Sequence, residues 1–105
     1  MINCRGDWWL GDPQSRAYRA AARAVEAEWG QRPLFVREGG SIPLTPYLEQ
    51  TLHAPVVHIP LSQASHKAHL ENERMRVENI NRAKGVLQGF ILEFCKPDPQ
   101  PTSNK

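Results

Sequence analysis

Two short stretches contain residues whose types and spacing could do chemistry. The first is REGGSIP, residues 37–43, in which Ser41 follows two glycines at the end of a short apolar run. Gly39 and Gly40 would allow positive φ angles and a close approach of the backbone to a bound group, while Ser41 could offer a hydroxyl and an amide at a helix start. That chemistry is capture of a substrate carboxylate or carbonyl. A tight turn in which Ser41 merely caps a helix would explain the same residues.

The second stretch is SQASHKAHLENER, residues 62–74. His66 and His69 are three positions apart, a spacing that two metal ligands can use on a helix, but two histidines do not make a site. A metal-binding role and a purely structural role therefore both stay open for them. Glu71 and Glu73 fall where the first turn of a long helix is expected, and there negative charge favours the helix dipole.

Three amphipathic helices are predicted to position these stretches. The first covers residues 13–29, with Asp12 as N-cap and Gly30 as the stop, the second covers 43–53, and the third covers 72–94. The expected apolar stripes are Tyr18, Ala21, Ala22, Val25 and Trp29 on the first helix, and Val77, Ile80, Ala83, Leu87, Phe90, Ile91 and Phe94 on the third.

Residues 33–38 and 55–61 are short apolar runs typical of strands. With the helix between them they have the length of a βαβ unit, so the predicted fold class is α/β with parallel strands and a right-handed crossover. Both motif stretches would then follow the carboxyl ends of strands, where open α/β sheets bind ligands. His53 and His58 are interpreted as helix-end and strand residues.

Composition limits the possible partners and location. The chain has 105 residues, 40% hydrophobic and 23% charged, which is typical of one small globular domain. The net charge of +2 is spread along the chain, so no nucleic-acid partner is expected. Cys4 and Cys95 show no Cys-x-x-Cys spacing, and no signal peptide or membrane-spanning run is visible, which favours a reduced cytoplasmic protein with no membrane partner.

Together, REGGSIP and AHLENER resemble the C-terminal end of the dinuclear zinc metallopeptidases of the carnosinase, Cys-Gly dipeptidase and aminoacylase type. DWWLGDP, the alanine-rich helix ending in EWG, and APVVHIPLSQAS are most similar to the fungal di- and tripeptidases of glutathione degradation. The resemblance covers about residues 7–94. It implies a partial zinc-peptidase catalytic domain over 12–95, preceded by a linker or the end of a dimerisation domain over 1–11. Residues 96–105, rich in proline, are expected to be a disordered tail.

The resemblance also implies site residues. In this family the histidine of the Ala-His-x-x-Asn-Glu motif ligates one of two zinc ions, and it matches His69. The serine of the Gly-Gly-Ser corner contacts substrate and matches Ser41, with Gly40 contributing backbone to the same pocket. His66 and Glu73 are expected as possible contacts behind the metal ligand.

Two departures from the family pattern affect the loop that carries His69. His66 stands where the family usually has an acidic residue, and Ser62 stands where a glycine commonly precedes Gln-Ala-Ser. The geometry of this loop is therefore expected to be altered, and such changes around a metal ligand can weaken metal binding by about 10–100-fold.

The remaining zinc ligands and the glutamate base of the family belong to sequence upstream of this chain. We therefore expect the C-terminal part of a di- or tripeptidase acting on small peptides, Cys-Gly or glutathione-related, and inactive as the isolated chain. The rival interpretations are a non-catalytic interaction module and a truncated gene product, packed on a full-length paralogous peptidase or a glutathione-pathway partner. Three helices cannot all be buried against two strands, so a large exposed apolar patch is also expected.

Overall fold

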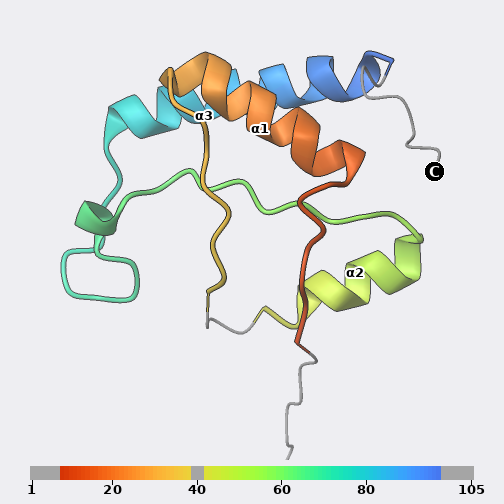
Figure 1. The fold of residues 1–105 in the computed structure, drawn as a ribbon. Helices are drawn as coiled ribbons and strands as arrows, with labels where there is room; N and C mark the ends of the chain where they lie inside the picture. The colour runs from red at the N-terminus through yellow and green to blue at the C-terminus, as the bar shows by residue number, and fades with distance from the viewer. Residues whose placement is uncertain (1–7, 39–41, 98–105) are drawn as a thin grey trace, which may run out of the picture.

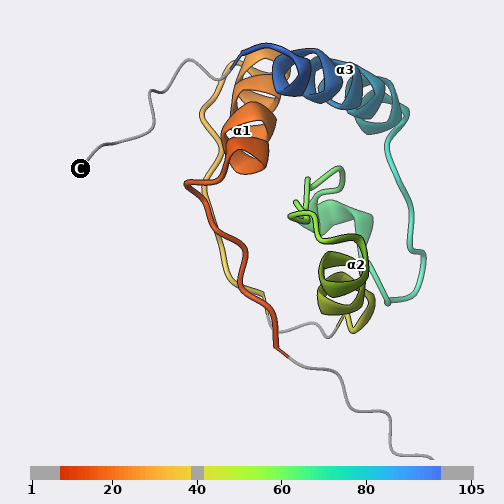
Figure 2. The same cartoon turned by 90° about the vertical axis from the view of Figure 1, so that its right-hand side faces the viewer.

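The computed structural model describes residues 8–38 and 42–97. Three α-helices and one short 3₁₀-helix follow one another along the chain: α1 (Arg16–Trp29), α2 (Leu44–Leu52), η1 (Ala64–His66) and α3 (Val77–Cys95). Figure 1 shows α1 and α3 side by side, with α2 apart from them and extended segments running between. The view in Figure 2 agrees with this arrangement. The three predicted α-helices are all present.

The first helix begins later than the sequence predicts, because a different residue caps it. The side-chain hydroxyl of Ser15 accepts a hydrogen bond from the Tyr18 backbone N–H at 3.3 Å, so Ser15 is the N-cap. Asp12 instead accepts from the Gln14 backbone N–H at 2.9 Å and forms a turn ahead of the helix. Both residues are of capping type, and the prediction chose the wrong one.

Left-handed residues end two of the helices. Gly30 has φ 73° and its N–H donates to the Glu26 carbonyl at 2.8 Å, which confirms the predicted stop of α1. His53 has φ 50° and ends α2, so its interpretation as a helix-end residue is confirmed.

The contact between α1 and α3 is made by small side chains. Gly89 of α3 lies against Ala24 so closely that a Cβ built on the glycine would be 3.3 Å from the alanine Cβ. The buried face of α1 is shifted by about one residue from the predicted stripe and shares only Ala21 with it, because close helix approach selects small residues over bulky ones. This buried core consists of Ala17, Ala20, Ala21 and Ala24 from α1 with Val86 from α3.

The predicted apolar stripe of α3 does not face α1. Most of its side chains lie away from Gly85, Val86 and Gly89 and are exposed, although the Arg16 guanidinium of α1 lies 4.9 Å from the Phe94 ring. We call this set the outer stripe of α3. Its exposed members are Val77, Ile80, Leu87, Ile91 and Phe94, of which Ile91 is 61% exposed. Docking of this stripe on a sheet is therefore not confirmed.

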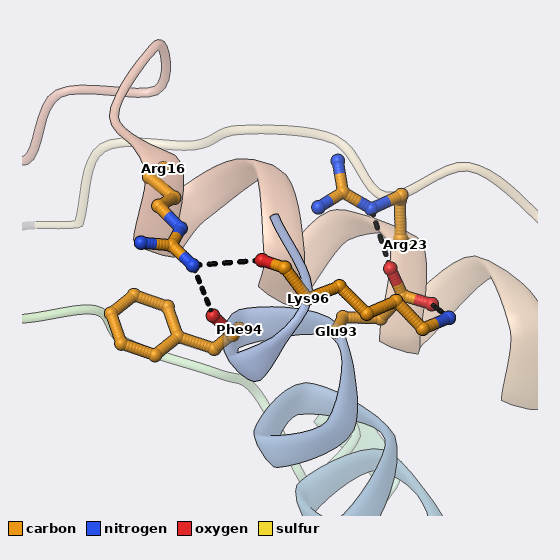
Figure 3. Close-up of polar contacts among 5 residues, drawn as sticks. All are labelled: Arg16, Arg23, Glu93, Phe94 and Lys96. Atoms are coloured by element: carbon orange, nitrogen blue, oxygen red, sulfur yellow. Dashed lines mark hydrogen bonds and ion pairs between the residues drawn. The ribbon is translucent and has the colours of Figure 1, made fainter. Parts of the chain in front are cut away.

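Polar contacts fasten the start of α1 to the end of α3, which makes the two helices antiparallel (Figure 3). One guanidinium nitrogen of Arg16 donates to the backbone carbonyls of Phe94 at 2.6 Å and Lys96 at 2.8 Å, at a helix end that leaves carbonyls without partners. Arg23 donates to the Glu93 carboxylate at 2.8 Å, and Lys96 Nζ lies 3.0 Å from its other oxygen. The hydrogen bond from Arg23, together with that from Lys96, lowers the pKa of Glu93 below its usual value.

The two predicted parallel strands are not confirmed. Within residues 8–38 and 42–97 no segment forms a strand, and residues 33–38 and 55–61 are extended without backbone-to-backbone hydrogen bonds to other described residues. A parallel ladder needs a neighbouring strand on at least one side, and neither segment has one here. Side chains hold the second segment instead: Glu49 accepts from the Val56 N–H at 3.2 Å, and Asn79 donates to the Leu61 carbonyl at 3.2 Å.

The molecule is flat, with principal extents of 48 × 37 × 20 Å, and has a very small core. Its radius of gyration is 15.9 Å, whereas a compact domain of this length would have about 13 Å. Consecutive apolar residues of the first extended segment are exposed, with Leu34 87% and Val36 78% accessible. Within the described part of the chain, no helix combines the length and the apolar character needed to cross a membrane.

Candidate functional site

The predicted ligand His69 lies in a loop with unusual backbone geometry. This histidine loop, residues 63–76, contains η1 and ends at the start of α3. Three of its residues are left-handed: Lys67 at φ 55°, His69 at φ 62° and Asn72 at φ 58°. None is a glycine, and non-glycine residues rarely adopt this conformation unless their surroundings enforce it. The surrounding structure therefore holds the loop backbone in a defined conformation that is energetically unfavourable for these residues.

His66 lies inside this loop and is only 3% exposed. Its Nδ1 is 3.1 Å from the Gln63 backbone nitrogen, and its Nε2 is 3.3 Å from the Arg76 backbone nitrogen. Its own carbonyl accepts a hydrogen bond from the Arg74 N–H at 2.9 Å. Because both ring nitrogens face backbone amides, His66 has no ring nitrogen directed to a metal beside His69. His66 was predicted to contact the metal ligand from behind; its ring instead contacts the backbone of the loop.

His69 itself is exposed. No hydrogen bond or ion pair joins its side chain to another described residue, so the ring is accessible to a group outside this part of the chain. Glu73 is also exposed and has no such partner. The expectation that Glu71 and Glu73 lie in the first turn of the long helix is wrong, because α3 begins at Val77 and its first-turn acidic residue is Glu78.

The described residues do not form a zinc site by themselves. They contain no group of three or more histidine, cysteine, aspartate or glutamate side chains placed to hold a metal ion. Structural zinc sites use four protein ligands, and catalytic sites use three with an open position. A single accessible imidazole such as that of His69 could contribute one ligand to a site completed from elsewhere.

The other half of the predicted site cannot be placed. Gly40 and Ser41 lie outside the described residues, so the predicted convergence of Ser41 with His69 stays a prediction. Residues on both sides of this gap are described: Glu38 is exposed, and Ile42 accepts the Thr45 N–H at 3.1 Å as α2 begins.

Sequence reasoning missed a polar cluster that joins the N-terminal segment to α2 and to the second extended segment. Trp9 Nε1 donates to a Glu49 carboxylate oxygen at 3.3 Å, and the Trp9 and His58 rings lie 5.0 Å apart. His58 Nε2 is 2.9 Å from the hydroxyl of Thr45, which is buried. The partners are up to 49 positions apart in the sequence, so no local pattern signalled them. The cluster positions α2 rather than forming a second reactive centre.

Comparison with known proteins connects this geometry to a family of peptidases. No family model matches the chain. Over 79 residues it is 40% identical to a probable di- and tripeptidase of Saccharomyces cerevisiae, a match that covers 75% of this chain and 9% of that protein. Over 91 residues it is 36% identical to a Cys-Gly metallodipeptidase of Candida albicans, covering 87% of this chain and 19% of that protein. The chain is homologous to a segment of these dipeptidases.

More distant members of the dipeptidase family and a solved structure agree. The human β-Ala-His dipeptidase is 28% identical over 88 residues, which cover 84% of this chain and 17% of that protein. The structure of a dipeptidase from Saccharomyces cerevisiae matches with a TM-score of 0.80 and 29% identity, covering 85% of this chain and 19% of that chain. The resemblance to carnosinase and the Cys-Gly dipeptidases is thereby confirmed. The chain spans less than a fifth of the length of each of these relatives.

Proposed function

We propose that this chain is the C-terminal part of the catalytic domain of a metal-dependent di- or tripeptidase. The observation that supports this most strongly is its 36% identity to a Cys-Gly metallodipeptidase over 87% of the chain. The substrate we propose is a small peptide, Cys-Gly itself or a glutathione-related peptide. We place the protein in the cytoplasm, because its two cysteines show no disulfide pattern and Cys95 is an exposed free thiol.

Within such an enzyme, we assign His69 the role of one zinc ligand in a two-zinc site. Its exposed ring, at a left-handed position of a constrained loop, supports this role. Ser41 and Gly40 would contact the peptide. Glu73, exposed on the same loop, is a candidate contact behind the ligand. The remaining ligands must come from outside these residues, because the described part of the chain supplies no three-ligand group, and we therefore expect the isolated chain to hydrolyse nothing.

In the complete domain, we propose that residues 33–38 and 55–61 are parallel strands of an α/β sheet. Their backbone groups lack ladder partners here, and Leu34 and Val36 are exposed beside Phe35, which is itself 55% exposed. Apolar side chains on both faces of one extended segment are typical of a strand covered on both sides. The same sheet would cover the outer stripe of α3.

A second candidate function uses the same exposed surface differently. The apolar residues left uncovered on α3 and on residues 34–36 would also suit a non-catalytic interaction module. Its partner would be a full-length paralogous peptidase or another protein of glutathione degradation.

A chimaera tests the enzyme proposal. The homologous segment of the Candida albicans Cys-Gly metallodipeptidase is replaced by the matching residues of this chain, and Cys-Gly hydrolysis is measured with and without a chelator. We expect chelator-sensitive activity that His69→Ala abolishes. The matched control is His53→Ala, because His53 is also an exposed left-handed histidine but ends α2 instead of lying in the histidine loop.

Three outcomes would count against the proposal. A chimaera whose activity survives His69→Ala would remove the ligand role. A folded, metal-loaded chimaera without activity would favour the interaction module. Finally, chelator-sensitive cleavage of Cys-Gly by the isolated 105-residue chain would show that the chain carries a complete site. In keeping with the proposal, zinc titration of the isolated chain by calorimetry should show no tight site.

A further inference from the structure

The histidine loop contains a second histidine whose role is different from that of His69. We infer that His66 is a positioning residue. Its ring accepts a hydrogen bond at the start of the loop and its backbone carbonyl accepts one near the end, and these contacts hold His69 in the left-handed conformation. The inference rests on the proposed function only in giving His69 a ligand role. The loop contacts that carry the inference lie within the chain and involve neither a metal nor a substrate.

The first observation is that contacts within the loop must stabilise its unusual backbone conformation. Lys67, His69 and Asn72 all have positive φ angles within six consecutive residues, and each adopts this conformation without being a glycine. Such backbone persists only where surrounding contacts over-determine it. A loop without those contacts would relax to the common regions of φ and ψ.

The second observation is that His66 is the buried side chain of the loop, and the exposed Gln63 side chain completes the reciprocal capping box with it. Between Leu61 and Asn79, His66 is the one buried residue, and every other residue in that interval is exposed. No apolar core holds the loop, so its shape depends on the polar contacts of His66 and on the turns formed by its backbone. These turns are short: the Lys67 N–H donates to Ala64, and the Leu70 N–H donates to Lys67.

The third observation is the geometry of the His66 ring. Gln63 is the N-cap of η1 and His66 is its third residue, and the Gln63 N–H lies 3.1 Å from His66 Nδ1. In a capping box, the side chain at this third position accepts a hydrogen bond from the N-cap backbone, and that position usually holds glutamate or glutamine. At the start of the loop, the His66 ring therefore makes the hydrogen bond that a glutamine side chain makes in a usual capping box.

The ring can accept at only one nitrogen. A neutral imidazole carries its proton on the other nitrogen, so the contacts of 3.1 Å at Nδ1 and 3.3 Å at Nε2 cannot both be accepted hydrogen bonds. The shorter contact and the capping geometry assign the acceptor to Nδ1 and the proton to Nε2, where the Arg76 N–H then lies 3.3 Å away without a hydrogen bond. The far end of the loop is then held by the Arg74 N–H, which donates to the His66 carbonyl at 2.9 Å.

Nuclear magnetic resonance of the ¹⁵N-labelled 105-residue chain tests this assignment, at a pH well above the ordinary histidine pKa. Long-range ¹H–¹⁵N spectra should show an unprotonated Nδ1 and a protonated Nε2 for His66. Couplings between the amide and α protons, with intraresidue nuclear Overhauser effects, should report left-handed Lys67, His69 and Asn72. His66→Ala should abolish this left-handed signature at all three residues, and His66→Gln should restore it.

The matched control is His53→Ala, which removes a left-handed histidine from α2 and should leave the histidine loop unchanged. The inference is overturned by a proton on Nδ1, by a wild-type loop without the left-handed signature, by a His66→Ala variant that keeps it, or by a His66→Gln variant that fails to restore it. None of these readouts involves zinc or a peptide. Loss of the His69 role in the chimaera would therefore contradict the proposed function without contradicting this inference.

Discussion

At the residue scale, the carboxylate of Glu93 makes the α1–α3 pair sensitive to acid. A hydrogen bond from Arg23, which is the largest cause, and one from Lys96 lower the pKa of Glu93 in the folded chain. A lowered folded-state pKa contributes stability above the pKa of the unfolded chain, and that stability is lost as pH falls through the lower value. The contribution is therefore complete at neutral pH, begins to fall below about pH 4, near the ordinary glutamate pKa, and is gone below the lowered pKa of the folded chain.

Glu93→Gln should reproduce this loss at neutral pH. We expect the urea midpoint of the helical circular dichroism signal to fall at pH 7 in the variant, and the difference from the unmodified chain to shrink as the pH is lowered below about 4 and to vanish once Glu93 is protonated in the folded chain. Glu26→Gln is the control, because Glu26 is an exposed carboxylate on α1 whose side chain makes no hydrogen bond or ion pair with a described residue. A difference that is equal at both pH values would show that the ion pair with Arg23 does not stabilise the helix pair.

The residue scale also shows where local patterns succeed. Gly30 and His53 were assigned to helix ends, and both are left-handed there. The choice between Asp12 and Ser15 as N-cap failed, because both side chains can cap and the tertiary position of α1 selects one. For His66, the spacing from His69 indicated a neighbour of the ligand, but only the folded loop showed that its ring contacts the backbone of Gln63.

At the element scale, the glycines of α3 set the distance between α1 and α3. A side chain at Gly89 would meet Ala24, whose position is set by the helix backbone, whereas one at Gly85 would meet only the flexible end of Glu28. We expect Gly89→Leu to lower the free energy of unfolding of the helix pair by about 1–3 kcal/mol, because the helices must separate.

Gly85→Ala is the matched variant for this prediction. It should stabilise the pair by about 0.5–1 kcal/mol, because alanine loses less backbone entropy in a helix and the Glu28 carboxylate can move aside. Urea titration followed by circular dichroism measures both changes. If Gly89→Leu were as stable as the unmodified chain, the two helices would not be in close contact in solution.

Helix faces illustrate why periodicity alone can mislead at this scale. The spacing of apolar residues correctly indicated amphipathic helices near 13–29 and 72–94, which the structure shows at 16–29 and 77–95. It gave greater weight to Tyr18, Trp29 and the outer stripe of α3 than to alanine and glycine. Which face packs on a neighbour depends on how closely the neighbour can approach, and that is a property of the pair.

At the scale of the whole molecule, the chain leaves much of its apolar surface uncovered. The outer stripe of α3 and residues 34–36 are exposed, and the buried apolar residues are four alanines and one valine among the described positions. We expect the isolated chain to bind a hydrophobic dye such as anilinonaphthalene sulfonate and to unfold over a broad temperature range, because so small a core provides little cooperativity.

The double change Leu87→Gln and Ile91→Gln should reduce dye fluorescence strongly while preserving the helical signal, since both side chains are exposed on the outer stripe. Ala24→Gln is the contrasting variant, because it alters the buried α1 face and should reduce the helical signal instead. A chain that is monomeric, binds no dye and unfolds sharply would show that the exposed surface is covered in solution by its own residues.

The sequence by itself determined the helices, their ends at Gly30 and His53, and the relation to the dipeptidase family through REGGSIP and AHLENER, because these depend on local spacing and residue type. The tertiary structure alone decided which faces of α1 and α3 meet, how His66 closes the histidine loop, and that residues 33–38 and 55–61 form no ladder with the described part of the chain. These features depend on neighbours distant in sequence: two helices must come together to select Ala24 and Gly89 as a contact, and an extended segment becomes a strand only where another strand supplies its hydrogen bonds.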